Sequence, residues 1–273
     1  MKVSFIHMGG PKMASYRYRA QTPAKELGAS INDLEADCII FSKPGTVGQV
    51  TLAHALKKQG KTVIVDVCDD HLGDVTYQDL IRAADFVTCP TEAMAERLLP
   101  WADATVIPDP YEFEEVEPHC KGHRLLWFGH GTNLYSLSRI LPDLNGWPLT
   151  IVSNVPWAVQ WSLEEMQRQF PIADMVVLPA TADYKSPNRA IESIRQGCFV
   201  VAEPHPSLKG IPGIWIGNIK EGIEWARSNT QEANERTKWA QDSIRERYSP
   251  ATQANAWRSL LQKVRSRSTS VAA

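Results

Sequence analysis

Four polar side chains gather where a helix is expected to begin in the second half of the chain. They are Lys185, Ser186, Asn188 and Arg189, and Glu192 follows one turn later on the helical face of Asn188 and Arg189. Free backbone N–H groups at a helix start, together with two cationic side chains, favour binding of an anion such as a phosphate. The carboxylate of Glu192 could accept both hydroxyls of a ribose, or it could pair with Arg189. The residues alone leave a nucleotide site and a plain helix cap with an ion pair both open.

Two strands and a helix must position these side chains. The apolar run Met175–Leu178 predicts a parallel strand that is buried on both faces. Ser186 and Pro187 predict the N-cap and first residue of a helix over 188–196, which Gly197 ends before the next strand. In open parallel sheets, ligands bind beyond the carboxyl ends of the strands, so this helix is expected to start at a binding crevice.

Strands and helices alternate along the whole chain with short connections, which predicts an α/β protein with parallel sheets. The segment 108–122 interrupts this rhythm with prolines and a run of glutamates, and it is interpreted as a linker. We therefore expect one domain over 1–112, a second over 113–249, and a closing helix with a flexible tail over 250–273. The apolar residues of that helix recur at helical spacing, which is typical of core packing, although its basic end could touch a membrane.

Composition narrows the class of protein. The 273 residues are 43% hydrophobic and carry a net charge of -2, which gives no whole-molecule attraction to nucleic acid or to an anionic membrane. No apolar run approaches the roughly 20 residues of a membrane span, and the chain enters a strand at once, without a secretory signal. The five cysteines are scattered and odd in number, which is typical of reduced thiols. These features predict a cytoplasmic protein, with contact at a membrane surface left open.

Several short motifs share an order and spacing along nearly the whole chain. They are Gly9-Gly10 after the first strand, Tyr16–Arg19, Val65–Asp70, Ala84–Thr91, Ile107–Pro110, Leu126–Gly129, the segment 173–197, and Tyr248-Ser249 before Trp257. Together they resemble a GT-B glycosyltransferase, and glycosyltransferase family 4 most of all.

The resemblance implies two Rossmann-like domains that face each other across a cleft, with the closing helix packed back on the first domain. It also implies an enzyme that transfers a sugar from a nucleotide-diphosphate donor to an acceptor, with retention of configuration and without a metal or other cofactor. The second domain of such enzymes binds the donor and the first binds the acceptor. The acceptor itself stays open among a glycan, a lipid, a small molecule and a modified nucleic acid.

Site residues follow from the resemblance and from the charges above. Donor binding is expected of Gly9, Gly10, Gly129, Asn133, Asp183, Tyr184, Lys185, Ser186, Asn188, Arg189 and Glu192. Catalytic roles are expected of Lys185, Arg189 and Asp70, and acceptor-side contacts of Arg17, Asp69, Asp70 and His71. Family members often have an acidic residue where Tyr184 stands, and a basic pair near His130. Lys185 and Arg189 would replace that pair.

Other interpretations of the same residues stay open. Asp66, Asp69 and Asp70 follow a buried strand and could hold a metal ion, contact the acceptor or lie solvated in a turn. His71 could act as an acid or base, or could simply be solvated. At the level of the whole protein, the alternatives are a sugar-nucleotide epimerase and a non-catalytic module that binds a nucleotide or a glycan.

Overall fold

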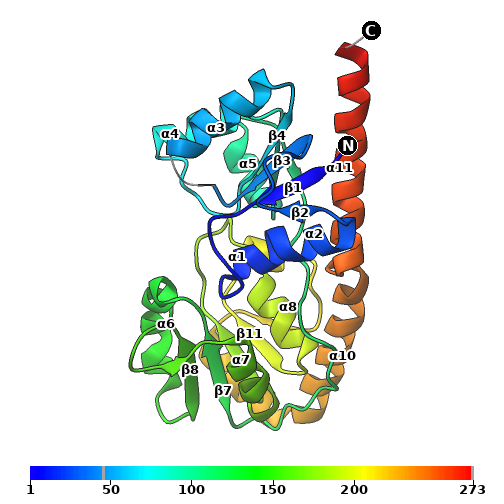
Figure 1. The fold of residues 1–273 in the computed structure, drawn as a ribbon. Helices are drawn as coiled ribbons and strands as arrows, with labels where there is room; N and C mark the ends of the chain where they lie inside the picture. Colours follow the sequence, from blue (N-terminus) through cyan, green and yellow to red (C-terminus); the bar gives the residue numbers. More distant parts are fainter. Residues whose placement is uncertain (45–46, 272–273) are drawn as a thin grey trace. The chain divides into compact units, whose positions relative to one another are not determined.

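A computed structural model describes residues 1–44 and 47–271, which form two compact units (Figure 1). The first unit contains Met1–Pro110, the short segment Tyr184–Ser186 and the chain from Tyr248 onward. The second unit contains Tyr111–Asp183 and Pro187–Arg247. The chain thus crosses between units several times, and Lys185 belongs by its contacts to the first unit.

The described part of the first unit holds a six-stranded parallel sheet in the order β2-β1-β3-β4-β5-β6. The strands are β1 (Val3–Ile6), β2 (Ser30–Ile31), β3 (Cys38–Ser42), β4 (Thr62–Asp66), β5 (Phe86–Cys89) and β6 (Ala104–Val106). Every residue of β3 is buried, as expected for a central parallel strand covered on both faces. The two-residue strand β2 has too short an apolar pattern to be predicted.

Helices cover both faces of this sheet (Figure 1). Alternate β3 residues Ile39 and Phe41 face the core under α3 (Val47–Lys58), α4 (Val75–Ala83) and α5 (Glu92–Leu98). Cys38 and Ile40 face the other way, toward α2 (Thr22–Leu27) and α11 (Pro250–Val271). In that second core Trp257 of α11 is fully buried, and its ring meets the ring of Phe5 edge-on with centroids 5.3 Å apart.

The predicted closing helix is therefore confirmed, and it packs on the first unit against α2. The helix continues to Val271, into the segment that was expected to be a flexible tail. Residues 272–273 of the predicted flexible tail lie outside the described residues. Across residues 1–44 and 47–271, no helix combines the length and hydropathy that a membrane crossing requires.

The segment 14–27 forms three helical pieces rather than one regular helix. A short α1 (Ala14–Tyr16) runs into a π-helical turn, η1 (Arg17–Gln21), before α2 begins. The π-turn inserts an extra residue, and both Arg17 and Arg19 are buried. Gly28 ends α2 with φ of 63°, as its position in the sequence predicts.

The described part of the second unit holds another six-stranded parallel sheet, in the order β12-β11-β10-β7-β8-β9. Its strands are β7 (Leu125–Phe128), β8 (Leu149–Ser153), β9 (Val159–Gln160), β10 (Met175–Leu178), β11 (Phe199–Ala202) and β12 (Trp215–Ile216). Its helices are α6 (Leu134–Ile140), α7 (Leu163–Gln169), α8 (Asn188–Arg195), α9 (Ile219–Ser228) and α10 (Thr230–Arg247). Helices α9 and α10 are separated at Asn229, whose side-chain amide donates to the carbonyl of Trp225 at 2.8 Å.

Candidate functional site

Helix α8 begins in the second unit at Asn188, as predicted, but its N-cap is Pro187 and not Ser186. Ser186 belongs to the first unit, where its side chain lies near the carboxylate of Asp109. The N-cap prediction for Ser186 is wrong, because Pro187 takes the N-cap position and Ser186 lies one residue before it. In the described part of the chain, no side chain caps the start of α8. Backbone N–H groups of its first turn are therefore left for another acceptor.

Arg189 carries the main positive charge at this helix start. Its side chain is half-buried, and Nη1 lies 3.4 Å from the carbonyl oxygen of Phe128, the last residue of β7. Among the described residues, no carboxylate lies within ion-pair distance of the guanidinium. Burial lowers the pKa of Arg189 to about 10, which still leaves it charged at neutral pH. The ion pair with Glu192, one of the two sequence interpretations, is not formed.

Gly129 lies directly against this guanidinium. A Cβ at Gly129 would stand 3.4 Å from Nη1 of Arg189 and 3.1 Å from the ring of Trp127. A side chain there would fill the space over the strand end, so glycine keeps the backbone open to close approach. Gly129 and Arg189, which were both expected to bind the donor, therefore lie together in the second unit.

The loop that follows Gly129 carries no cation of its own but is well ordered by hydrogen bonds. Nδ1 of His130 lies 3.0 Å from the hydroxyl of Thr132, and Asn154 accepts the N–H of Gly131 at 2.7 Å. Asn133 donates its backbone N–H to the carbonyl of His130 at 2.8 Å and stands immediately before α6. The cation near this strand end is supplied by Arg189 from α8.

Glu192 is 3% exposed and its carboxylate is held by backbone groups. Oε1 accepts the N–H of Glu112 at 2.7 Å, and Oε2 accepts the N–H of Phe113 at 3.2 Å. Carboxylates that accept backbone N–H groups are held in a fixed orientation by short, charge-assisted bonds. Glu192 therefore anchors the beginning of the second unit, a role that the sequence did not indicate.

In the first unit, Lys185 is paired with Asp69. Oδ1 of Asp69 contacts Nζ of Lys185, and Oδ2 lies 2.9 Å from Nζ of Lys43. Burial acts to raise the pKa of Asp69, but the two lysines outweigh it and the pKa is lowered. The sequence analysis did not predict Lys43 as a site residue. It directly follows the carboxyl end of β3, and position after a buried parallel strand was the reason for choosing Asp69.

Tyr184 and Asp70 meet through Arg97. The guanidinium of Arg97 stands 5.3 Å above the ring of Tyr184 and pairs with the carboxylate of Asp70. Thr91 donates its hydroxyl to the carbonyl of Tyr184 at 2.9 Å. The structure therefore brings four expected site residues together in the first unit: Asp69, Asp70, Tyr184 and Lys185. His71 is exposed nearby, and its ring packs edge-on against Tyr77 at 5.5 Å between centroids.

The Gly9-Gly10 turn is held by a histidine. Nδ1 of His7 accepts the N–H of Gly9 at 2.8 Å, and Nε2 lies 3.3 Å from the hydroxyl of Ser15. A Cβ at Gly9 would overlap Sδ of Met13 and would lie 3.0 Å from the His7 ring, which favours glycine at this position. Arg17, expected on the acceptor side, is 5% exposed and donates from Nη1 to the carbonyl of Pro11 at 2.8 Å.

Asp66 has a structural environment that differs from that of Asp69 and Asp70. It is fully buried and accepts Nε of Arg19 at 2.9 Å and the hydroxyl of Thr88 at 2.6 Å. Arg19 also contacts Asp109 at 3.2 Å. Within the part of the chain that the structure describes, no three His, Cys, Asp or Glu side chains are grouped so that they could hold a metal ion.

Two parallel α/β units, with a C-terminal helix that returns to the first unit, define a GT-B fold. No protein-family model matches the chain, and no curated protein does either. Solved structures of similar fold include Anabaena Alr3699/HepE in complex with UDP-glucose, which is 14% identical. That match covers 96% of this chain and 100% of the other, with a TM-score of 0.68.

Two further solved structures resemble this chain less closely. A mutant of S. aureus TarM, in complex with UDP among other ligands, is 16% identical over 82% of this chain and 55% of the other, with a TM-score of 0.63. An α1,3-fucosyltransferase with GDP-fucose is 8% identical over 86% of this chain and 80% of the other, with a TM-score of 0.55. At such low identities these matches show the fold alone, and the fold class predicted from the sequence is confirmed.

Proposed function

We propose that the protein is a glycosyltransferase that moves a sugar from a nucleotide-diphosphate donor to an acceptor, with retention of configuration as in glycosyltransferase family 4. The observation that carries this proposal is Arg189, a half-buried cation without a carboxylate partner among the described residues, beside Gly129 and an uncapped helix start. A buried charge without a partner costs free energy, which a bound anion offsets. A diphosphate supplies such an anion.

The donor that we propose to test first is UDP-glucose, because it is bound in the solved structure of similar fold that matches nearly the whole chain. Arg189, Gly129 and the N–H groups of Asn188 and its neighbours are assigned to the diphosphate. The Glu192 carboxylate, whose orientation the backbone N–H groups of Glu112 and Phe113 fix, is assigned to the ribose hydroxyls. Further donor contacts are assigned to Gly9, Gly10, Asn133, Asp183, Tyr184 and Ser186.

The proposed chemistry is electrostatic. When the bond between sugar and phosphate breaks, negative charge grows on the leaving diphosphate, and fixed cations stabilise that charge. Lys185, Arg189 and the start of α8 are assigned this task, without a metal ion. Asp70 is assigned a catalytic contact with the acceptor, and Arg17, Asp69 and His71 are assigned to the acceptor side. The acceptor is proposed only as a hydroxyl-bearing molecule.

Turnover of nucleotide sugars tests the proposal directly. Purified protein is incubated with a panel of UDP- and GDP-sugars, and release of the nucleoside diphosphate is measured with and without acceptors. Lys185→Ala and Arg189→Ala are expected to lower the rate of release strongly, while Arg168→Ala, which removes an exposed arginine of α7, serves as the matched control. Full activity in both site variants would contradict the assignment.

A second candidate is a binding module that holds a nucleotide without transferring a sugar. It is favoured by Tyr184, whose ring lies under Arg97 at a position where the resemblance leads us to expect an acid. Calorimetry distinguishes the two functions, since the module would bind a nucleoside diphosphate yet release none from any donor.

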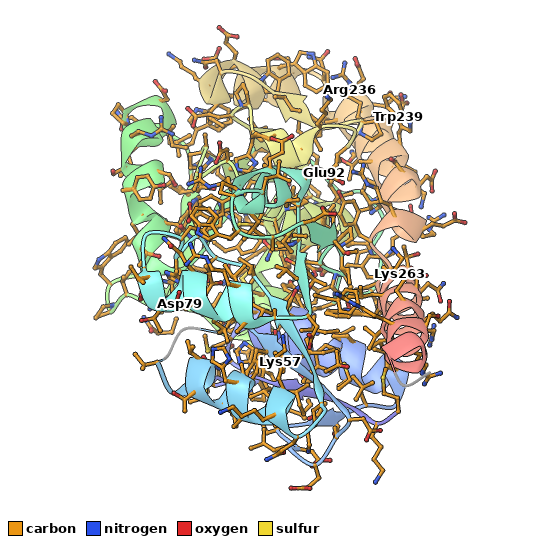
Figure 2. All side chains as sticks on the ribbon, turned by 90° about the horizontal axis from the view of Figure 1, so that it is seen from above. Lys57, Asp79, Glu92, Arg236, Trp239 and Lys263 are labelled. Carbon is orange, nitrogen blue, oxygen red and sulfur yellow. The ribbon has the colours of Figure 1, made fainter. Side chains whose placement is uncertain are left out.

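The proposed compartment is the cytoplasm, because all five cysteines are free thiols, as is usual where the medium is reducing. Contact with a membrane surface is also retained as a proposal. Arg258, Lys263 and Arg265 are exposed on α11, and Lys263 projects outward from that helix in Figure 2. Basic side chains such as these are attracted to anionic lipid headgroups.

A further inference from the structure

In the loop after β10, charged side chains bind both the backbone N–H and the backbone carbonyl of Ala180. Oε2 of Glu203 accepts the N–H of Ala180 at 2.6 Å. Nη2 of Arg139 lies 3.4 Å from the carbonyl oxygen of Ala180 and 2.7 Å from Oε2 of Glu203. Glu203 follows β11 and Arg139 lies on α6, so two separate elements of the second unit hold the same residue.

A histidine holds the loop two residues further on. Nε2 of His205 lies 2.9 Å from the carbonyl oxygen of Ala182. A carbonyl only accepts hydrogen bonds, so Nε2 must carry the proton. Nδ1 can then accept the backbone N–H of Ser207 at 3.2 Å and its hydroxyl at 2.8 Å. All the polar atoms of the ring therefore have partners, and the ring is fixed.

The sheet topology explains why these groups meet. Strands β10 and β11 are parallel neighbours with Leu178 opposite Ala202, so the loops that follow them leave the same edge of the sheet. The loop over 180–183 carries two alanines, a threonine and an exposed aspartate, Asp183, and therefore buries little apolar surface of its own. Short loops of this kind are mobile unless other groups hold them.

Electrostatic contacts connect the loop with Arg189. Burial lowers the pKa of His205, the hydrogen bond to Ala182 acts in the opposite direction, Arg189 lowers it further and Asp183 raises it. The charges of Arg189, which is assigned to the diphosphate, and of Asp183, at the end of the loop, both act on His205. Strand β10 also pairs in parallel with β7, whose last residue Phe128 lies beside Arg189, so the held loop and the proposed phosphate site lie at the same edge of the sheet.

We propose that Glu203, Arg139 and His205 form a loop clamp that sets the backbone of residues 180–183 for the sugar of the donor. This inference rests on the proposed function. The three side chains act through the Ala180 and Ala182 backbone groups, so they are positioning residues. The clamp gives the loop its shape before any donor binds.

Hydrogen–deuterium exchange tests the clamp without any ligand. In Glu203→Ala the Ala180 amide loses its acceptor, and exchange of a peptide that spans 180–183 is expected to become about tenfold faster. Glu203→Gln keeps an acceptor oxygen and should restore most of the protection. Glu164→Ala is the matched control, because Glu164 pairs with Arg168 on the surface of the same unit. Unchanged exchange in Glu203→Ala overturns the clamp.

Kinetics with UDP-glucose, or with the nucleotide sugar that the donor panel identifies, test whether the loop clamp positions the donor. Glu203→Ala and His205→Ala are expected to lower kcat by about 10- to 100-fold, because small misplacement of reacting groups is costly. Their affinity for UDP, which lacks the sugar, should stay within about twofold of wild type. Unchanged kcat in both variants overturns the positioning role. A wild-type protein that neither binds nor turns over any nucleotide sugar overturns the proposed function instead, while the exchange result still decides whether the clamp exists.

Discussion

Nη1 of Arg189 lies 3.4 Å from the carbonyl oxygen of Phe128, and no carboxylate among the described residues neutralises its charge. The guanidinium on α8 therefore reaches the end of β7, where a loop without its own cation begins. A carbonyl at this distance is a weak partner for a charged group. This relationship identifies Arg189 as a residue whose main partner is expected to be a ligand.

Replacement of Arg189 by alanine should therefore weaken ligand binding without weakening the fold. Charge-assisted hydrogen bonds contribute about 1.5–3 kcal/mol, so UDP affinity measured by calorimetry should fall roughly 10- to 100-fold. The melting temperature without ligand should stay the same or rise, because a poorly paired charge is removed. Arg168→Ala should change neither quantity. A large drop in melting temperature for Arg189→Ala would show instead that the residue is structural.

Local signals in the sequence predict the elements around this site well. The valine-rich run before Pro179 predicts β10, and Gly197 ends α8 with φ of 75°, the left-handed conformation that glycine adopts readily. Binding of Glu192 to Glu112 and Phe113 could not be predicted, because the residues are about 80 positions apart. Hydrophobic periodicity places a residue on a face, but does not select which distant backbone group it meets.

The ion pair of Lys185 also shows that the sequence does not identify a distant partner. Its charge and its place before a helix are visible in the sequence, and they predicted a phosphate contact. Its partner Asp69 is 116 residues earlier in the chain. Ser186 fails as an N-cap because the helix begins one residue later, with Pro187 in the N-cap position. Tertiary contacts of polar side chains override local preferences wherever a segment packs against a distant element.

Lys185→Ala should separate catalysis from stability. Side chains of Lys185 and Asp69 are 36% and 21% exposed, and Asp69 keeps Lys43 as a second partner. Such partly exposed pairs contribute about 0–1 kcal/mol, so urea denaturation should show a small change. Donor turnover should fall at least tenfold if the ammonium stabilises the leaving group. Lys58→Ala, at an exposed position of α3, is the control. Loss of stability in proportion to loss of turnover would refute the catalytic assignment.

Glu192→Ala should destabilise the second unit even without a ligand. The substitution leaves the N–H groups of Glu112 and Phe113 without their acceptor, at a cost of about 1–3 kcal/mol for each buried group left unsatisfied. Glu192→Gln keeps one acceptor oxygen and should cost less. Chemical denaturation measures both, with Glu224→Gln on the exposed face of α9 as the control. If Glu192→Gln folds well but loses UDP affinity, the ribose contact is supported, whereas unchanged affinity would leave Glu192 a structural role only.

Asp66→Ala should be the most damaging of the aspartate substitutions. Removing it leaves the Arg19 guanidinium, 1% exposed, with a buried charge and only Asp109 as an acidic partner among the described residues. Breaking a buried pair from one side typically costs about 3–5 kcal/mol. The combined change Arg19→Met with Asp66→Leu should recover part of that loss, as measured by thermal denaturation. A stable Asp66→Ala protein with altered metal dependence would instead favour the metal interpretation of this aspartate.

The His7 side chain predicts how stability depends on pH. Its Nδ1 accepts the Gly9 N–H, which requires an unprotonated nitrogen. Burial lowers the pKa of His7, Lys43 lowers it further, and Asp66 opposes the shift. An unfolded histidine titrates near about 6.5, so below this pH the unfolded chain binds more protons than the folded one. The contribution is complete above about pH 6.5 and is lost as the pH falls toward the lower folded pKa.

His7→Asn isolates this contribution, because asparagine offers an acceptor to the Gly9 N–H but does not titrate. Urea denaturation from about pH 5 to 7.5 should give a free energy of unfolding that falls less steeply toward acid in His7→Asn than in the wild type. His205 has a lowered pKa as well and contributes with the same sign, so its slope persists in the variant. Parallel pH profiles for the two proteins would contradict the prediction, because they would mean that His7 keeps the same protonation in the folded and the unfolded chain.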